Sequence, residues 1–142
     1  MKAYLNRRYS FPASHRLHSD ALSAEANDTA YGKCNNPHGH GHNYTVEVTV
    51  SGQVDGSTGM VCDLVELDGF VQKNVLSLFD HANLNTLPQF SATVPTSENL
   101  GIEIYKIFSQ HFHTAKLERI RLEETAKNSF EFVSDDKGRT TS

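Results

Sequence analysis

The chain has 142 residues, 37% hydrophobic and 21% charged, and we expect one domain over residues 1–142 with a polar tail at 134–142 that frays. A formal net charge of −4 argues against nucleic acid as a partner, and no apolar run approaches the roughly 18 residues of a membrane span. Two cysteines and no secretory signal predict reduced thiols and a cytoplasmic location.

The first third of the chain predicts one strand followed by irregular structure. Tyr9 and Phe11 share one face of a predicted strand over residues 3–11. The polar stretch 16–33 predicts a long excursion with room for one helical turn. The segment 32–42 contains an Asn-Asn-Pro turn and two isolated glycines, so it cannot form a regular helix.

The middle of the chain predicts a strand pair and a helix. Apolar and polar residues alternate over residues 44–52, which is typical of a half-buried strand, and residues 60–64 predict its partner across a turn. Asp63 can cap a helix over residues 64–79. The inner face of that helix is predicted to carry Leu64, Leu67, Val71, Val75 and Leu78.

The last third predicts a second helix and a hairpin. Thr96 or Ser97 can cap the helix. Its predicted inner face carries Leu100, Ile104, Ile107 and Phe108. Residues 117–124 and 129–134 predict two strands joined by a short turn. The order of elements indicates an α+β domain with a mainly antiparallel sheet and two helices on one face.

Two histidines two residues apart form the strongest local signal. His40 and His42 flank a glycine, and in a strand their side chains point to the same side. Both continue the even-numbered series that begins with the buried Tyr44. Neutral imidazole nitrogens suit Zn²⁺, although a His-Gly-His pair can equally sit in a polar loop.

A third histidine would complete a catalytic type of zinc site. His15 shares its parity with Phe11 on the first strand, although Pro12 can break that register. Three protein nitrogens with an open fourth position are typical of catalytic zinc. His38 has the same parity as His40 and remains an alternative ligand on this pattern.

Cys34 and the Asp80-His81 pair are further candidates for chemistry. Cys34 lies in a polar turn, where it can be a fourth zinc ligand, a thiolate near the metal, or a small buried residue. Asp80 can tune the adjacent imidazole of His81 as a proton relay, a weak signal because such dipeptides are common.

Glu124 continues the buried parity of its strand. An inward carboxylate is costly unless it is paired, and a planar ligand with adjacent N–H donors would satisfy it. The alternative is that the strand has already left the core at this position. Glu98 has a simpler explanation, because an acidic residue in the first turn favours the helix dipole.

These motifs, in this order, resemble the 6-pyruvoyl-tetrahydropterin synthase and 6-carboxy-tetrahydropterin synthase family. The resemblance covers most of the chain, and its most specific block is GKCNNPHGHGHNY. The blocks that carry it are FPASHRLHS, GKCNNPHGHGHNYTVEVTVSG, TGMVCDL, FDHANLN, PTSEN and the Glu124-Thr125 pair. It implies the tunnelling fold (T-fold), an antiparallel four-stranded sheet with two helices on one face. Three such subunits would close a β-barrel, and two trimers would form a homohexamer.

The resemblance also implies roles for residues at matching positions. It makes His15, His40 and His42 the ligands of Zn²⁺, which lowers the claim of His38. It makes Cys34 the catalytic base. The remaining roles are a relay of Asp80 and His81, and a pterin site of Glu124, Thr125, Thr96, Ser97 and Glu98.

The implied reaction is a lyase reaction on 7,8-dihydroneopterin triphosphate, with elimination of triphosphate and an internal redox rearrangement. One branch of the family leads to tetrahydrobiopterin and the other, through 6-carboxy-tetrahydropterin, to queuosine. The five residues between Cys34 and His40 favour the pyruvoyl branch slightly. Other hypotheses are a non-catalytic zinc module held by Cys34, His40 and His42, and a metal-free enzyme of the dihydroneopterin aldolase type.

Overall fold

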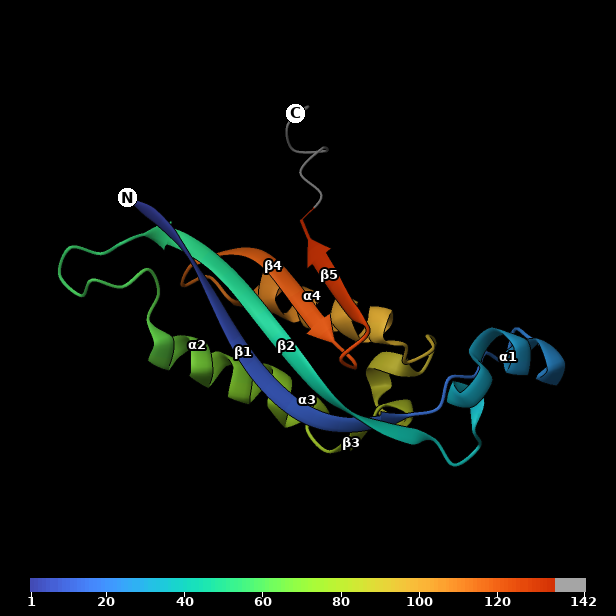
Figure 1. Ribbon diagram of the computed structural model, residues 1–142. Coiled ribbons are helices and arrows are strands. Elements are labelled where there is room, and N and C mark those ends of the chain that lie inside the picture. Colours follow the sequence, from blue (N-terminus) through green and yellow to red (C-terminus); the bar gives the residue numbers. More distant parts are fainter. Residues whose placement is uncertain (135–142) are drawn as a thin grey trace, which may run out of the picture.

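A five-stranded sheet forms the centre of the computed structural model, which describes residues 1–134 (Figure 1). Most of the tail expected at 134–142 therefore lies outside the described residues. The strand order is β3-β1-β2-β4-β5, and only β3 pairs in parallel. The strands are β1 (Lys2–His15), β2 (His40–Gln53), β3 (Ala82–Asn83), β4 (Lys116–Glu123) and β5 (Ser129–Val133).

β1 and β2 form one long antiparallel ribbon. Their register runs without a shift from Lys2 opposite Gln53 to His15 opposite His40. Pro12 lies within β1, opposite Asn43 of β2, without breaking the strand. Its carbonyl accepts from the His81 N–H, so its missing N–H also faces the β3 side, where the ladder pairs only the two residues that follow. β1 is therefore longer than the predicted strand over 3–11.

The two main helices pack on one face of the sheet, as predicted (Figure 1). Phe70 and Phe108 bring the two main helices into contact, with ring centroids 5.0 Å apart. The helical elements are α1 (Ala24–Tyr31), η1 (Gly32–Asn35), α2 (Leu64–Val71), the π-turn η2 (Gln72–Leu76), α3 (Ser77–Phe79), η3 (Leu84–Thr86), η4 (Pro88–Phe90) and α4 (Ser97–His111). The buried core between these layers includes Tyr44, Val46, Val48, Leu67, Val71, Leu100, Ile104, Phe108, Ile120 and Leu122.

The predicted caps occur at the two main helices. The Asp63 carboxylate accepts hydrogen bonds from two backbone N–H groups of the first turn of α2. The Thr96 hydroxyl accepts one from the N–H of Asn99 in α4. Each cap satisfies backbone donors that have no partner inside the helix.

Two sequence predictions about the sheet are wrong. Residues 60–64 do not form a strand, because β2 already has β1 on one side and β4 on the other. The sheet also has five strands, since Ala82–Asn83 adds a short parallel strand beside the end of β1. The α+β class and the antiparallel core of the sheet are confirmed.

The helix predicted over 64–79 contains an irregularity that the apolar pattern does not reveal. The π-turn adds one residue to the helix, so the face that follows it is displaced by one position. Phe79 is fully buried in consequence, whereas Leu78, expected on the inner face, is 37% exposed.

The polar excursion over 16–33 contains more helix than the expected single turn. Ser23 caps α1 through its hydroxyl, which accepts from the N–H of Ala26. Figure 1 shows α1 beyond the end of the sheet where β1 finishes and β2 begins. Over the described residues, no helix is long and apolar enough to cross a membrane.

Gly101 in α4 generates a prediction about packing. A Cβ at this position would overlap the Phe132 ring, which packs over the helix from β5. We expect Gly101→Ala to lower the free energy of unfolding by about 1–3 kcal/mol, in spite of the better helix propensity of alanine. Urea unfolding measures the difference.

Gly69→Ala is the matched control. Gly69 lies in α2, and among the described residues no atom outside the neighbouring helix backbone lies within 4 Å of an added Cβ, so the substitution should stabilise by about 0.5–1 kcal/mol. A gain in stability from Gly101→Ala would mean that the Phe132 ring moves aside without cost, contrary to this account.

Candidate metal centre

Three histidines gather where β1 ends and β2 begins. His15 is the last residue of β1 and lies directly opposite His40, the first residue of β2, with His42 two positions further on the same face. The Nε2 atoms of His15 and His40 are 3.1 Å apart, and those of His40 and His42 are 2.9 Å apart. All three ligand atoms lie within 4.8 Å of one another.

A hydrogen bond orients His15 toward this cluster. Its Nδ1 lies 2.8 Å from the carbonyl oxygen of Pro95, which can only accept, so Nδ1 carries the proton. The neutral ring then presents its Nε2 lone pair to the other two imidazoles. A backbone carbonyl on the second nitrogen is the usual outer-shell partner of a metal-bound histidine.

The cluster fits a tetrahedral metal ion by distance and by charge. Ligand nitrogens about 2.0–2.1 Å from a tetrahedral zinc lie about 3.3 Å from each other, close to the spacing found here. Burial lowers the pKa of His15 and of His40, which keeps both rings in the neutral form that binds metals. His40 Nδ1 is buried with no hydrogen-bond partner among the described residues.

His38 is not part of this group. It lies in the exposed turn before β2, and its backbone N–H donates to the Asn36 side chain. The structure therefore gathers His15, His40 and His42, and leaves the alternative ligand outside.

Glu124 lies beside the start of α4. The Ser97 hydroxyl, 2% exposed as a residue, donates a hydrogen bond to the Glu124 carboxylate. The backbone N–H of Glu124 donates to the Asn128 carbonyl at 3.0 Å, so the residue begins the turn after β4. Its negative charge raises the pKa of Cys34, and it opposes the larger lowering that burial causes at His15 and His40.

Cys34 is half-buried on η1, close enough to Glu124 to be affected by its charge. Burial, followed by the Glu124 carboxylate, raises the pKa of the thiol. The Cys34 carbonyl accepts a hydrogen bond of 2.7 Å from Leu17 N–H. A thiolate at this position therefore needs a nearby positive charge.

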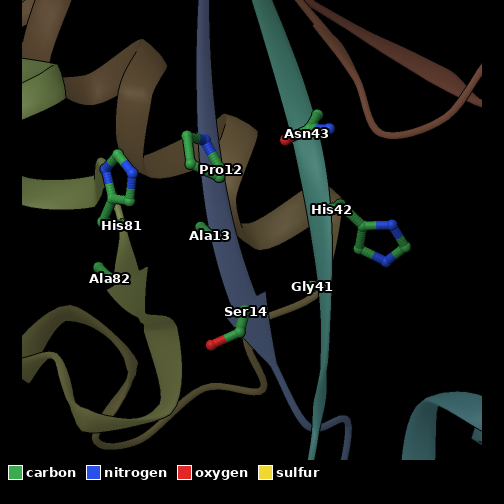
Figure 2. Close-up of a pocket in the computed structure, with 8 residues that line it drawn as sticks. All are labelled: Pro12, Ala13, Ser14, Gly41, His42, Asn43, His81 and Ala82. Carbon is green, nitrogen blue, oxygen red and sulfur yellow. The ribbon is translucent and has the colours of Figure 1, made fainter.

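Asp80 and His81 pair with each other but not with the cluster. Asp80 Oδ1 lies 2.8 Å from His81 Nδ1, and the His81 side chain is 78% exposed. His81 has a left-handed φ of 58° and its N–H donates to the Pro12 carbonyl at 2.7 Å. It borders a cavity of about 320 Å³ on the β1–β2 ribbon, and Figure 2 shows His81 and His42 on opposite sides of that ribbon.

The other expected pterin-site residues have local structural partners. The Thr96 hydroxyl caps α4, and Glu98 is exposed in its first turn. The Thr125 hydroxyl accepts from the backbone N–H groups of Lys127 and Asn128, so it stabilises the turn after β4. Of this group, the structure places Ser97 in contact with Glu124.

Sequence reasoning missed Pro95. Its carbonyl links the segment before α4 to His15, across 80 positions of the chain. A backbone acceptor leaves no mark in the side-chain pattern, so only the position of Pro95 within the PTSEN motif hints at it.

The fold and the three converging imidazoles define a class, namely a candidate metalloprotein built on one α+β sheet. A model of the family described as 6-pyruvoyl tetrahydropterin synthase matches residues 4–135. The chain belongs to this family, and its sheet and helices are those of the tunnelling fold, with five strands in place of the expected four.

Known proteins similar to this chain include two vertebrate enzymes and a solved structure. The 6-pyruvoyl tetrahydrobiopterin synthase of Poecilia reticulata is 46% identical over 88% of this chain and 86% of its own length. The human protein of the same name is 42% identical over 89% of this chain and 88% of its own. The structure of Caenorhabditis elegans 6-pyruvoyl tetrahydropterin synthase matches with a TM-score of 0.89 at 40% identity, covering 95% of this chain and 97% of that one.

The other branch of the family is more distant. A putative 6-carboxy-5,6,7,8-tetrahydropterin synthase of Archaeoglobus fulgidus is 38% identical over 61% of this chain and 69% of its own length. The chain is therefore more similar to relatives named for the pyruvoyl product.

The environment of Cys34 gives a prediction for the metal-free protein. We expect its thiol pKa to lie above that of an unperturbed cysteine, because burial and the Glu124 charge both disfavour the thiolate. The pH dependence of iodoacetamide alkylation measures it, in a Cys62→Ala background that leaves one thiol.

Two further measurements test how nearby charges affect the Cys34 pKa. Glu124→Gln removes the negative charge near the thiol and should lower the Cys34 pKa. Added Zn²⁺ should also lower the Cys34 pKa, because its positive charge favours the thiolate. A midpoint at or below that of an unperturbed cysteine in the metal-free protein would contradict the described environment.

Proposed function

We propose that this protein is a zinc-dependent lyase that converts 7,8-dihydroneopterin triphosphate to 6-pyruvoyl-tetrahydropterin with loss of triphosphate. The observation that carries the proposal is the convergence of three imidazole nitrogens beside a carboxylate fixed at the start of α4. The names of the similar vertebrate and nematode proteins support the choice of product.

The metal is assigned to His15, His40 and His42, with the fourth position left for substrate oxygens. Bound Zn²⁺ would acidify the carbons next to those oxygens and so lower the cost of proton transfer. His15 is held for this role by the Pro95 carbonyl, and the burial of His15 and His40 keeps their rings neutral.

Glu124 is assigned to the pterin. A carboxylate can accept two parallel hydrogen bonds from adjacent N–H groups on a planar ring, which fixes the ring's orientation. Ser97 donates to one carboxylate oxygen and so limits its rotation. Thr96 and Glu98 would contribute to the site through the first turn of α4, which Thr96 caps. Thr125 would contribute through the turn after β4.

Cys34 is assigned as the base that removes the substrate proton. Its thiol pKa is raised in the metal-free chain, so the positive charge of bound zinc is needed for a useful fraction of thiolate at neutral pH. The thiol does not belong to the group of converging ligand atoms, which favours a base over a fourth ligand.

Asp80 and His81 are assigned as a proton relay that serves a neighbouring subunit. In one chain the exposed His81 lies beside β1 and is not among the converging ligands, so we assign the relay to the metal centre of a second copy (Figure 2). The open edge of β5, and that of β1 before the two residues paired with β3, support closure of a barrel by three subunits, and we extend the proposal to a homohexamer of two trimers.

We further propose that residues 1–142 act as one catalytic domain in the cytoplasm. The 6-carboxy-tetrahydropterin product of queuosine synthesis is the second candidate, supported by the archaeal relative over a shorter part of the chain. A structural zinc module would need Cys34 among the ligands, and a metal-free aldolase would leave the three facing imidazoles without a role.

The test of this function is mass spectrometry of the product formed from 7,8-dihydroneopterin triphosphate by the zinc-loaded protein. We expect 6-pyruvoyl-tetrahydropterin and one triphosphate per turnover. The 6-carboxy product would establish the second candidate, and absence of any product would contradict the enzyme assignment.

Glu124→Gln tests the pterin anchor. The amide keeps the shape of the side chain but loses the charge and one acceptor, so substrate affinity should fall about tenfold to a hundredfold. Zinc content should not change, because Glu124 is not among the converging ligands. Calorimetric binding of a pterin and metal analysis of the same sample measure both effects, and unchanged affinity would remove Glu124 from this role.

A further inference from the structure

The chain leaves the sheet immediately after the candidate ligand His15. The β1–β3 ladder ends with Ser14 opposite Asn83, and the β1–β2 ladder ends with His15 opposite His40. Beyond this point no strand supplies partners for the backbone of Arg16. His15 itself is held by its pairing with His40 and by the Pro95 carbonyl, and the contacts of the two residues that follow add to these.

The side chain of Asn85 supplies those partners for Arg16. The Arg16 N–H donates to Asn85 Oδ1 at 2.7 Å, and Asn85 Nδ2 donates to the Arg16 carbonyl at 2.9 Å. One amide thus makes the same two-point contact that a neighbouring strand would make, and it extends the β1–β3 pairing past the ladder. The backbone N–H of Asn85 itself donates to Asn83 Oδ1 at 3.1 Å, which orients the residue.

The next residue, Leu17, is held by the segment that carries Cys34. Its N–H donates to the Cys34 carbonyl at 2.7 Å, and its carbonyl accepts from Asn35 Nδ2 at 2.8 Å. The backbone groups of residues 16 and 17 are therefore paired in one continuous series. That series runs from Asn85 on one side to Cys34 on the other, with His15 directly before it.

Gly39, in the turn before β2, lies close to the backbone of His15. Gly39 has a φ of 73°, and a Cβ on it would lie 3.2 Å from the His15 carbonyl oxygen. The turn before β2 thus packs closely against the backbone of His15 and Arg16.

We propose that Asn85 is a positioning residue that, through its two hydrogen bonds to the Arg16 backbone, holds His15 and the Cys34 segment in one arrangement. The inference rests on the proposed function, in which His15 binds zinc and Cys34 is the base. Asn85 lies in the FDHANLN segment but has no role in the chemistry assigned to Asp80 and His81 from that segment.

Two measurements on the purified protein test this role without turnover. The first is the zinc dissociation constant, from competition with a chromogenic chelator. The second is the rate of Cys34 alkylation by iodoacetamide in a Cys62→Ala background. For Asn85→Ala we expect zinc to bind about tenfold more weakly, as for loss of other outer-shell partners. Alkylation should become faster because the half-buried Cys34 segment loosens.

Asn85→Asp separates the two hydrogen bonds. It keeps an acceptor for the Arg16 N–H but sets a second oxygen against the Arg16 carbonyl, so we expect losses at least as large as in Asn85→Ala. Since Asn85 is exposed and aspartate has the same shape, this variant decides the question if Asn85→Ala does not fold.

Asn74→Ala is the matched control. Asn74 also donates its side-chain amide to a backbone carbonyl, that of Phe70, at 3.0 Å, but within the helix and away from the histidines. It should lower the unfolding temperature without changing zinc affinity or alkylation. If the Asn85 variants keep the wild-type zinc affinity and the wild-type rate of Cys34 alkylation, the proposal is overturned.

The outcomes separate this inference from the proposed function. Zinc affinity and thiol alkylation require no pterin, so a wild-type protein that binds zinc but forms no product would refute the lyase assignment alone. Unchanged zinc affinity and alkylation in Asn85→Asp, with wild-type turnover intact, would refute the positioning role alone.

Discussion

The antiparallel ladder between β1 and β2 determines where the candidate metal ligands lie. Its register is continuous over the full length of both strands, and it ends with His15 directly opposite His40. Because residues two apart on a strand share a face, His42 joins the same side. A slip of one residue in either strand would turn its imidazoles to the other face of the sheet, so the register that buries Tyr44 and Val46 also assembles the site.

A second contact joins this ribbon to the helical layer. The Pro95 carbonyl fixes the tautomer of His15, and two residues later Ser97 donates to Glu124. The short segment at the start of α4 therefore touches both the metal side and the carboxylate side of the site. A movement of α4 along the sheet would change both at once, which couples packing of the core to geometry of the site.

Much of the fold follows from periodicity. Alternation in β2 and β4 and the caps of α2 and α4 predict these elements because each depends on residues close in sequence. The strand expected at 60–64 fails because an apolar run does not record whether a neighbouring position in the sheet is free. The π-turn escapes prediction because it preserves an apolar stripe and displaces it by one residue.

The sequence predicts which residues form the candidate site better than it predicts how they are held. Parity indicates that His15, His40 and His42 can share a face, and the structure gathers them. Parity cannot reveal backbone partners such as Pro95 or the amide of Asn85, because these contacts depend on how distant segments meet. It also cannot show that His81 lies beside β1 while His42 lies beside β2, which follows from the path of the chain after α3 (Figure 2).

The central claim is an open metal site of three imidazoles with Cys34 outside the coordination shell. Zinc K-edge X-ray absorption on the zinc-loaded protein tests it most directly. The account predicts three imidazole nitrogens and one oxygen at about 2.0–2.1 Å, with no sulfur. A sulfur scatterer at about 2.3 Å would place Cys34 on the metal and contradict the account.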